Sequence, residues 1–163
     1  MEREKKILLV SHCIINQNSV VFPLARAKGP FPFVDTIIKN NIGIYQLPCP
    51  EFKFGGLNRP SQTKEEYDTK EFRDLCKTLS SDVVKDIKEY LKHDFQLLGI
   101  IGIENSPTCS ISGKRGIFIE ELFDNLATNN IKLDYIEIPS GYEENLESIS
   151  KVNSELLNII YKK

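Results

Sequence analysis

The chain has 163 residues, of which 40% are hydrophobic and 27% are charged, and its formal net charge at pH 7 is −2. This length suits one domain with a proper core rather than two, and the composition is typical of a soluble globular protein. The small negative charge gives no reason to expect nucleic acid or a membrane surface as a partner, and the longest apolar stretch, Leu97–Ile103, is far too short to span a bilayer.

The N-terminus predicts a cytoplasmic protein. Met1–Lys6 leads into only a short apolar run, so we expect no secretory signal. In the cytoplasm cysteines usually stay reduced, and metal binding or catalysis therefore explains them better than disulfide bonds do. The four cysteines are Cys13, Cys49, Cys76 and Cys109.

The N-terminal part begins with Lys6–Val10, a β-branched and apolar run that is typical of a buried parallel strand. Residues 14–28 show no clear periodicity, and we expect them to wind over the surface or to form an irregular helix. After a break rich in Gly and Pro, Phe33–Asn40 is predicted to be a helix, and Ile42–Leu47 a second strand. The inward side chains of this helix are expected to be Val34, Ile37 and Ile38.

The clearest helix follows the polar stretch Ser61–Asp68. In Thr69–His93 the apolar residues recur at three- and four-residue steps and form one stripe, which includes Cys76. We expect Cys76 to be a packing residue. The later elements are a strand at Phe95–Ile103, a helix at Ile117–Thr128, a strand at Ile131–Ile138 and a helix at Glu143–Tyr161.

Strands that alternate with helices predict an α/β fold. We expect a single three-layer α/β/α domain over residues 1–163, with a mainly parallel, open, Rossmann-like sheet. In such sheets ligands bind in the crevice beyond the carboxyl ends of the strands. Cys13, Cys49 and Cys109 each follow a different predicted strand by two to six residues. The order of elements therefore predicts that three thiols meet at one crevice.

Cys49 lies between two prolines and is followed by Glu51. Because proline offers no N–H and fixes φ, we expect a stiff, non-helical loop that presents both the thiol and the carboxylate. A free buried cysteine in a tight turn is the simpler alternative.

Three cysteines without a C-x-x-C pair do not suit a zinc finger or a thioredoxin-type dithiol. Three thiolates on separate loops suit a cubane iron–sulfur cluster in which one iron stays open. Such an iron is a soft Lewis acid that binds a substrate sulfur or oxygen. A structural zinc site, and a cluster used only for electron transfer, remain alternatives.

Several polar residues near the cysteines are candidates for the same site. Glu51 could act as a general base or simply be a solvated acid or helix cap. Ser106 could donate a hydrogen bond to substrate or serve as a turn residue, and His12 could orient or protonate a ligand or be structural. The candidates for the substrate pocket are His12, Asn16, Gly55, Gly56 and Arg59.

Three motifs together resemble the 2-thiouracil desulfurase family, in the right order and over most of the chain. They are Ser11-His12-Cys13, then Cys49-Pro50-Glu51 with Gly55-Gly56-Leu57 and Arg59-Pro60, then Ser106-Pro107-Thr108-Cys109 with Gly113 and Gly116.

The resemblance implies a 4Fe-4S cluster held by Cys13, Cys49 and Cys109, whose fourth iron would bind the sulfur of a thiocarbonyl compound. Water would replace that sulfur, giving the oxo product and sulfide without net redox change. The family's catalytic glutamate and serine fall on Glu51 and Ser106.

The chain departs from the family pattern after its first and third cysteines. Ile14-Ile15-Asn16 stands where the family usually has Leu-Leu-Gly, and Ser110 replaces a glycine. We therefore predict a divergent desulfurase, or desulfidase, that acts on a small thiolated compound such as a thio-nucleobase. The alternative is a non-catalytic iron–sulfur module for sulfur transfer, sensing or electron transfer.

Overall fold

A four-stranded, all-parallel sheet forms the centre of the computed structural model, which describes residues 1–162. Its strands lie in the order β2-β1-β3-β4. β1 pairs with β2 in the register Leu8↔Ile44 and with β3 in the register Leu9↔Ile100. The strands are β1 (Lys6–Val10), β2 (Gly43–Gln46), β3 (Gln96–Ile103) and β4 (Tyr135–Ile138). The predicted α/β class with an open parallel sheet is confirmed.

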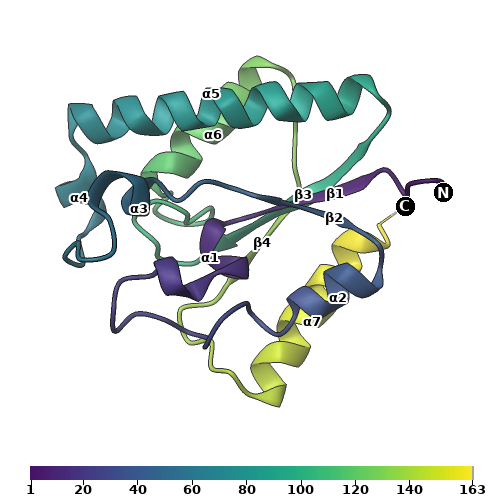
Figure 1. Ribbon diagram of the computed structural model, residues 1–163, viewed down its shortest axis with the longest axis horizontal. Coiled ribbons are helices and arrows are strands. Elements are labelled where there is room, and N and C mark those ends of the chain that lie inside the picture. Colours follow the sequence, from purple (N-terminus) through teal and green to yellow (C-terminus); the bar gives the residue numbers. More distant parts are fainter. Residues whose placement is uncertain (163) are drawn as a thin grey trace.

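Helices cover both faces of this sheet (Figure 1). On one face lie α5 (Lys70–Lys92) and α6 (Ile117–Thr128), and on the other lie α2 (Val34–Lys39) and α7 (Leu146–Ile160). Side chains alternate along a strand, so β1 sends Ile7 and Leu9 into the core under α5 and α6, and Leu8 and Val10 into the opposite core. A strand buried on both faces has to be apolar throughout, which explains the unbroken apolar run of β1.

The long helix α5 begins at an N-cap. The hydroxyl of Thr69 accepts a hydrogen bond from the backbone N–H of Phe72 at 3.2 Å, which satisfies one of the free donors of the first turn. Its apolar stripe packs on the sheet and on α6, and Cys76 lies fully buried within it. The packing role predicted for Cys76 agrees with this position.

Several elements are shorter than predicted, and the C-terminal helix α7 begins at Leu146 rather than Glu143. β4 begins at Tyr135 rather than Ile131, because its ladder with β3 starts at the pair Ile100↔Tyr135. In α2 only Val34 and Ile37 are buried, and Ile38, expected to face inward, is 60% exposed because the short helix touches the core along a narrow line.

The segments around the carboxyl ends of the strands contain short helices. The polar stretch after Pro60 holds α4 (Lys64–Tyr67), which starts at a capping box: Thr63 accepts from the N–H of Glu66, and the Glu66 carboxylate accepts from the N–H of Thr63. The irregular N-terminal segment contains α1 (His12–Ile15) and a 3-10 turn at Gln17–Ser19. Across residues 1–162, no helix combines the length and apolarity needed to cross a bilayer.

Candidate thiol site

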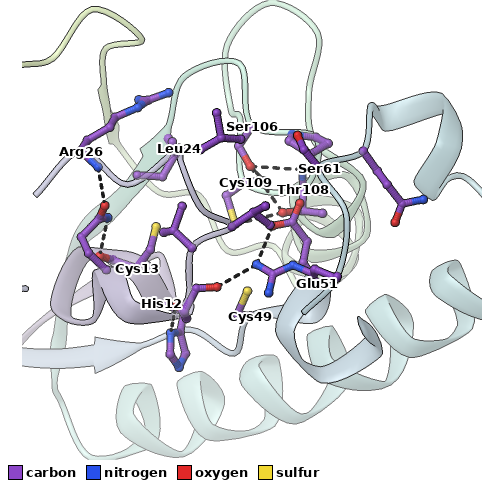
Figure 2. A pocket seen from close by; sticks show the side chains of 18 of the residues that line it. His12, Cys13, Leu24, Arg26, Cys49, Glu51, Ser61, Ser106, Thr108 and Cys109 are labelled. Atoms are coloured by element: carbon purple, nitrogen blue, oxygen red, sulfur yellow. Dashed lines mark hydrogen bonds and ion pairs between the residues drawn. The ribbon is translucent and has the colours of Figure 1, made fainter. Parts of the chain in front are cut away.

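Three thiols line one cavity at the carboxyl ends of β1, β2 and β3. Cys13 comes from α1, Cys49 from the residue before α3 (Pro50–Gly55), and Cys109 from the turn after β3 (Figure 2). The cavity encloses about 150 Å³. Burial raises the pKa of Cys13, and the neighbouring thiols Cys109 and Cys49 raise it further. The pKa of Cys109 is likewise raised by burial first and then by Cys49. The structure thus brings together the three cysteines that the order of elements had predicted to meet.

Cys49 is the extended N-cap of α3, and Glu51 lies in the first turn of this helix, so the prediction of a non-helical loop was wrong for Glu51. Pro50 is the first residue of α3, where its missing N–H costs nothing because that N–H has no intrahelical partner. The Sγ of Cys49 accepts a hydrogen bond from the N–H of Phe52 at 3.4 Å and caps the helix. Burial raises the pKa of this thiol, and the Phe52 hydrogen bond and the Arg59 charge oppose the rise.

Cys109 is held by a hydrogen-bonded turn. The Oγ of Ser106 accepts from the N–H of Cys109 at 3.0 Å and from that of Thr108 at 3.3 Å. The Thr108 hydroxyl lies 3.6 Å from the Cys109 Sγ and can donate to it. Burial raises the pKa of Cys109 to about 12. Ser106 therefore has the turn role that the sequence left open, and it also lines the cavity.

Cys13 is fixed through Gln17. The side-chain amide of Gln17 donates to the Cys13 carbonyl at 2.9 Å and accepts from the N–H of Arg26 at 2.8 Å. This buried glutamine ties α1 to the irregular segment that follows, so Val20, Val21 and Leu24 also line the cavity. Sequence reasoning missed these residues because the segment has no periodicity to show which side chains face inward.

Glu51 and Arg59 form a buried ion pair on the cavity wall. The Arg59 Nη2 lies 3.8 Å from the Glu51 Oε2, and the two side chains are 3% and 18% exposed respectively. Burial raises the pKa of Glu51, and the Arg59 charge acts in the opposite direction. A carboxylate held in this way faces the same space as the thiols.

Arg59 is held by backbone oxygens from two segments. Its Nη1 donates to the Gly56 carbonyl at 2.7 Å, and its Nη2 donates to the Ser19 carbonyl at 2.8 Å. Gly55 makes room for this side chain, because a Cβ at that position would lie 2.8 Å from the Cβ of Arg59. Gly55 and Gly56 therefore help to position Arg59 and do not line the cavity.

Two of the five predicted pocket residues, His12 and Arg59, line the cavity, whereas Asn16, Gly55 and Gly56 do not. The Asn16 side chain accepts from the N–H of Asn18 and caps the 3-10 turn. The Nδ1 of His12 lies 3.2 Å from the Ser19 hydroxyl, and its ring stacks on Phe52 with centroids 6.5 Å apart. Burial, with the Lys53 charge, lowers the pKa of His12, so it is neutral at physiological pH.

The donor set decides what the site could hold. All four cysteines are free, and Cys76 is the one that does not line the cavity. Within residues 1–162, no three His, Cys, Asp or Glu side chains gather closely enough to hold one metal ion. In an iron–sulfur cluster each thiolate binds a different iron, so its ligands stand farther apart than those of a single ion. Free thiols on three separate elements are candidate ligands for such a cluster.

The fold and the site define an open, parallel α/β protein with a thiol-lined cavity at the carboxyl ends of its strands. The chain is 49% identical over 141 residues to "Uncharacterized protein MJ0003" of Methanocaldococcus jannaschii, a match that covers 86% of this chain and 90% of the archaeal one. The protein therefore belongs to the same family as MJ0003. No family model matches the chain. No solved structure matches it either.

Proposed function

We propose that this protein is an iron–sulfur-dependent desulfurase that converts a thiocarbonyl group of a small compound into a carbonyl group and releases sulfide. The single observation that carries the proposal is the meeting of Cys13, Cys49 and Cys109 at one cavity wall that also presents Glu51. The resemblance to the 2-thiouracil desulfurase family supports the same reading, because its motifs supply these four residues.

In this proposal Cys13, Cys49 and Cys109 hold a 4Fe-4S cluster. When bound, the cluster supplies a soft Lewis acid that favours sulfur over oxygen. The three side chains suit it because they are free thiols on three different elements, and the N–H of Phe52 and the hydroxyl of Thr108 are already aimed at two of the sulfurs. Hydrogen bonds of this kind stabilise the thiolate form and tune the bound group.

The remaining chemistry falls to Glu51. Its carboxylate lies in the cavity wall, where it can take a proton from an attacking water at Oε1 or Oε2. Arg59 holds this carboxylate through the 3.8 Å ion pair, and the guanidinium is itself held by two carbonyls, so the base is preorganised. The reaction is a substitution, C=S plus H₂O giving C=O plus H₂S, and it needs no oxidant or reductant.

The apolar side of the cavity suits a small, flat compound. Val20, Val21 and Leu24 contribute apolar side chains to the lining of the cavity, and ligand pockets are lined predominantly by such groups. A thio-nucleobase has both the thiocarbonyl and the flat shape that such a lining accepts. We propose a cytoplasmic setting, with the four free cysteines as support.

The test is anaerobic reconstitution with iron and sulfide, followed by counting of iron and acid-labile sulfide and a screen of thiolated bases for sulfide release. Wild-type protein is expected to bind about four irons per chain and to release sulfide. Glu51→Gln is expected to keep the iron but lose at least a hundredfold in turnover, the scale of one general base. Exposed Glu71→Gln is the control and should match wild type.

Two outcomes would contradict the proposal. A chain that takes up no iron under strictly anaerobic conditions has no cluster-dependent chemistry. A chain that binds a cluster and shows a reversible redox signal, yet turns over none of the thiolated compounds, is the non-catalytic module instead.

A further inference from the structure

Two buried donors in the cavity wall have no hydrogen-bond partner within residues 1–162. They are the Nε of Arg59 and the hydroxyl of Tyr67, whose residues are 7% and 3% exposed. Both residues line the cavity with the three thiols. Leaving a buried donor unpaired costs about 1–3 kcal/mol, and such groups are rare in native proteins unless a ligand or a water completes them.

The Nε of Arg59 is buried and has no partner among the described residues, whereas both terminal nitrogens of the guanidinium have one. The two terminal nitrogens donate to the carbonyls of Gly56 and Ser19, at 2.7 and 2.8 Å, and these bonds fix the plane of the guanidinium. A donor fixed in this way loses little conformational entropy when a ligand accepts from it.

Tyr67 supplies the second donor from the last residue of α4. Its ring packs on Phe72 with the centroids 4.7 Å apart, which fixes the phenol in the wall. Burial raises the pKa of Tyr67 to about 12, so the hydroxyl keeps its proton at physiological pH. The Arg59 guanidinium lies near enough to the Tyr67 oxygen to oppose this rise through its charge and a hydrogen bond, but it carries only donors and cannot accept the hydroxyl proton.

Charge decides which kind of acceptor the two donors suit. The positive charge of Arg59 already faces the Glu51 carboxylate at 3.8 Å. A second carboxylate on the ligand would be repelled by Glu51 at short range and would gain little from an arginine that is already paired. A neutral acceptor meets both donors without this repulsion.

We propose that Tyr67 and Arg59 form a subsite for a neutral hydrogen-bond acceptor, a carbonyl oxygen or a ring nitrogen, carried by the substrate in addition to its thiocarbonyl. This inference rests on the proposed function and narrows its substrate class: uncharged thiolated heterocycles with a second acceptor are expected to bind, and thiolated carboxylic acids are not.

The test measures binding of two neutral carbonyl compounds, uracil and 2-pyridone, to the anaerobically prepared full-length chain by calorimetry, with orotate as the carboxylate comparison. Tyr67→Phe removes only the hydroxyl and is expected to weaken binding of the neutral compounds about tenfold, which corresponds to about 1.4 kcal/mol. Tyr142→Phe is the matched control, because the Tyr142 hydroxyl is also buried and unpartnered but lies outside the cavity. It is expected to change the affinity by less than twofold.

The inference is overturned if neither neutral compound binds, if Tyr67→Phe binds them as tightly as wild type, or if orotate binds more tightly than uracil. The thermal midpoints of both tyrosine variants are measured in parallel, and comparable midpoints show that a loss of binding is local.

The two proposals can fail separately. Sulfide release with an unchanged KM in Tyr67→Phe would contradict the proposed subsite while supporting the proposed desulfurase activity. The opposite result is also possible: the protein binds uracil in a Tyr67-dependent way but releases no sulfide from any thiolated base. This result would contradict the desulfurase activity and support the subsite.

Discussion

The Sγ of Cys49 accepts a hydrogen bond from the backbone N–H of Phe52 at 3.4 Å, so one side chain serves both as helix cap and as candidate cluster ligand. The same N-terminal turn carries Glu51, two residues further on. Capping the helix therefore also sets the direction of the carboxylate that faces the thiols, and the two functions of Cys49 can be separated by substitution.

Cys49→Ser is expected to abolish iron uptake while leaving stability close to wild type, because a serine hydroxyl caps a helix well. Cys49→Ala should lose the iron and also about 1 kcal/mol of stability with the cap. Iron content after anaerobic reconstitution and urea unfolding of the metal-free chains measure the two effects. Cys76→Ala is the control: it should keep the iron but lose about 1–2 kcal/mol from the core beneath α5. Full iron content in Cys49→Ser would exclude this thiol as a ligand.

The Glu137 carboxylate anchors the loop that follows Cys109. It accepts hydrogen bonds from the backbone N–H groups of Ile111 and Ser112, at 2.5 and 3.2 Å, and from the Ser112 hydroxyl. Glu137→Gln removes the charge that strengthens these bonds and is expected to cost about 1–3 kcal/mol of unfolding free energy. Urea unfolding measures this cost, with exposed Glu2→Gln as the charge-matched control. Equal stability of the two variants would show that the loop does not depend on Glu137.

Gly116 is required by the close approach of two segments. A Cβ there would lie 2.2 Å from the carbonyl carbon of Thr108 and 2.6 Å from the backbone nitrogen of Cys109. Gly116→Ala is therefore expected to displace the Cys109 turn and to lower stability by several kcal/mol. Gly29→Ala, where a Cβ meets no atom within 4 Å, should stay within about 1 kcal/mol of wild type. Thermal unfolding of both variants tests the contrast, and a well-tolerated Gly116→Ala would mean that the turn yields easily.

The ion pairs of Arg73 are expected to contribute stability that is lost at low pH. Its guanidinium binds Asp68, Glu120 and Glu121, and the pKa of Asp68 is lowered chiefly by its hydrogen bond with Arg73. A carboxyl whose pKa falls on folding stabilises the native state above its unfolded pKa, near 4, and loses that contribution as the pH falls through the folded value. Arg73→Met should therefore lower the urea midpoint at pH 7 and approach wild type near pH 3.

Lys85→Met removes one positive charge from the exposed side of the same helix and serves as the control. It should leave the difference between pH 7 and pH 3 unchanged. A midpoint difference between Arg73→Met and wild type that persists undiminished at pH 3 would show that packing, and not the ion pairs, is responsible.

Local sequence patterns predicted the strands and helices well wherever burial is periodic. β1, α5 and α6 lie within one residue of their predicted limits, because a strand buried on both faces and a helix with one apolar stripe leave clear signals. The helical start after Cys49 was missed because proline argued against a ladder and was not read as the first residue of a helix. α4 was missed although Thr63 and Glu66 have the capping-box spacing.

The sequence by itself determined that three thiols would meet, because parallel strands joined by helices bring their carboxyl ends to one edge whatever the loops do. Only the tertiary structure decided what surrounds those thiols. Arg59 reaches the carbonyl of Ser19, 40 positions earlier in the chain, and Tyr67 joins the same wall from a separate short helix. Contacts of this kind are set by packing between irregular segments, which have no periodic pattern from which their inward side could be predicted.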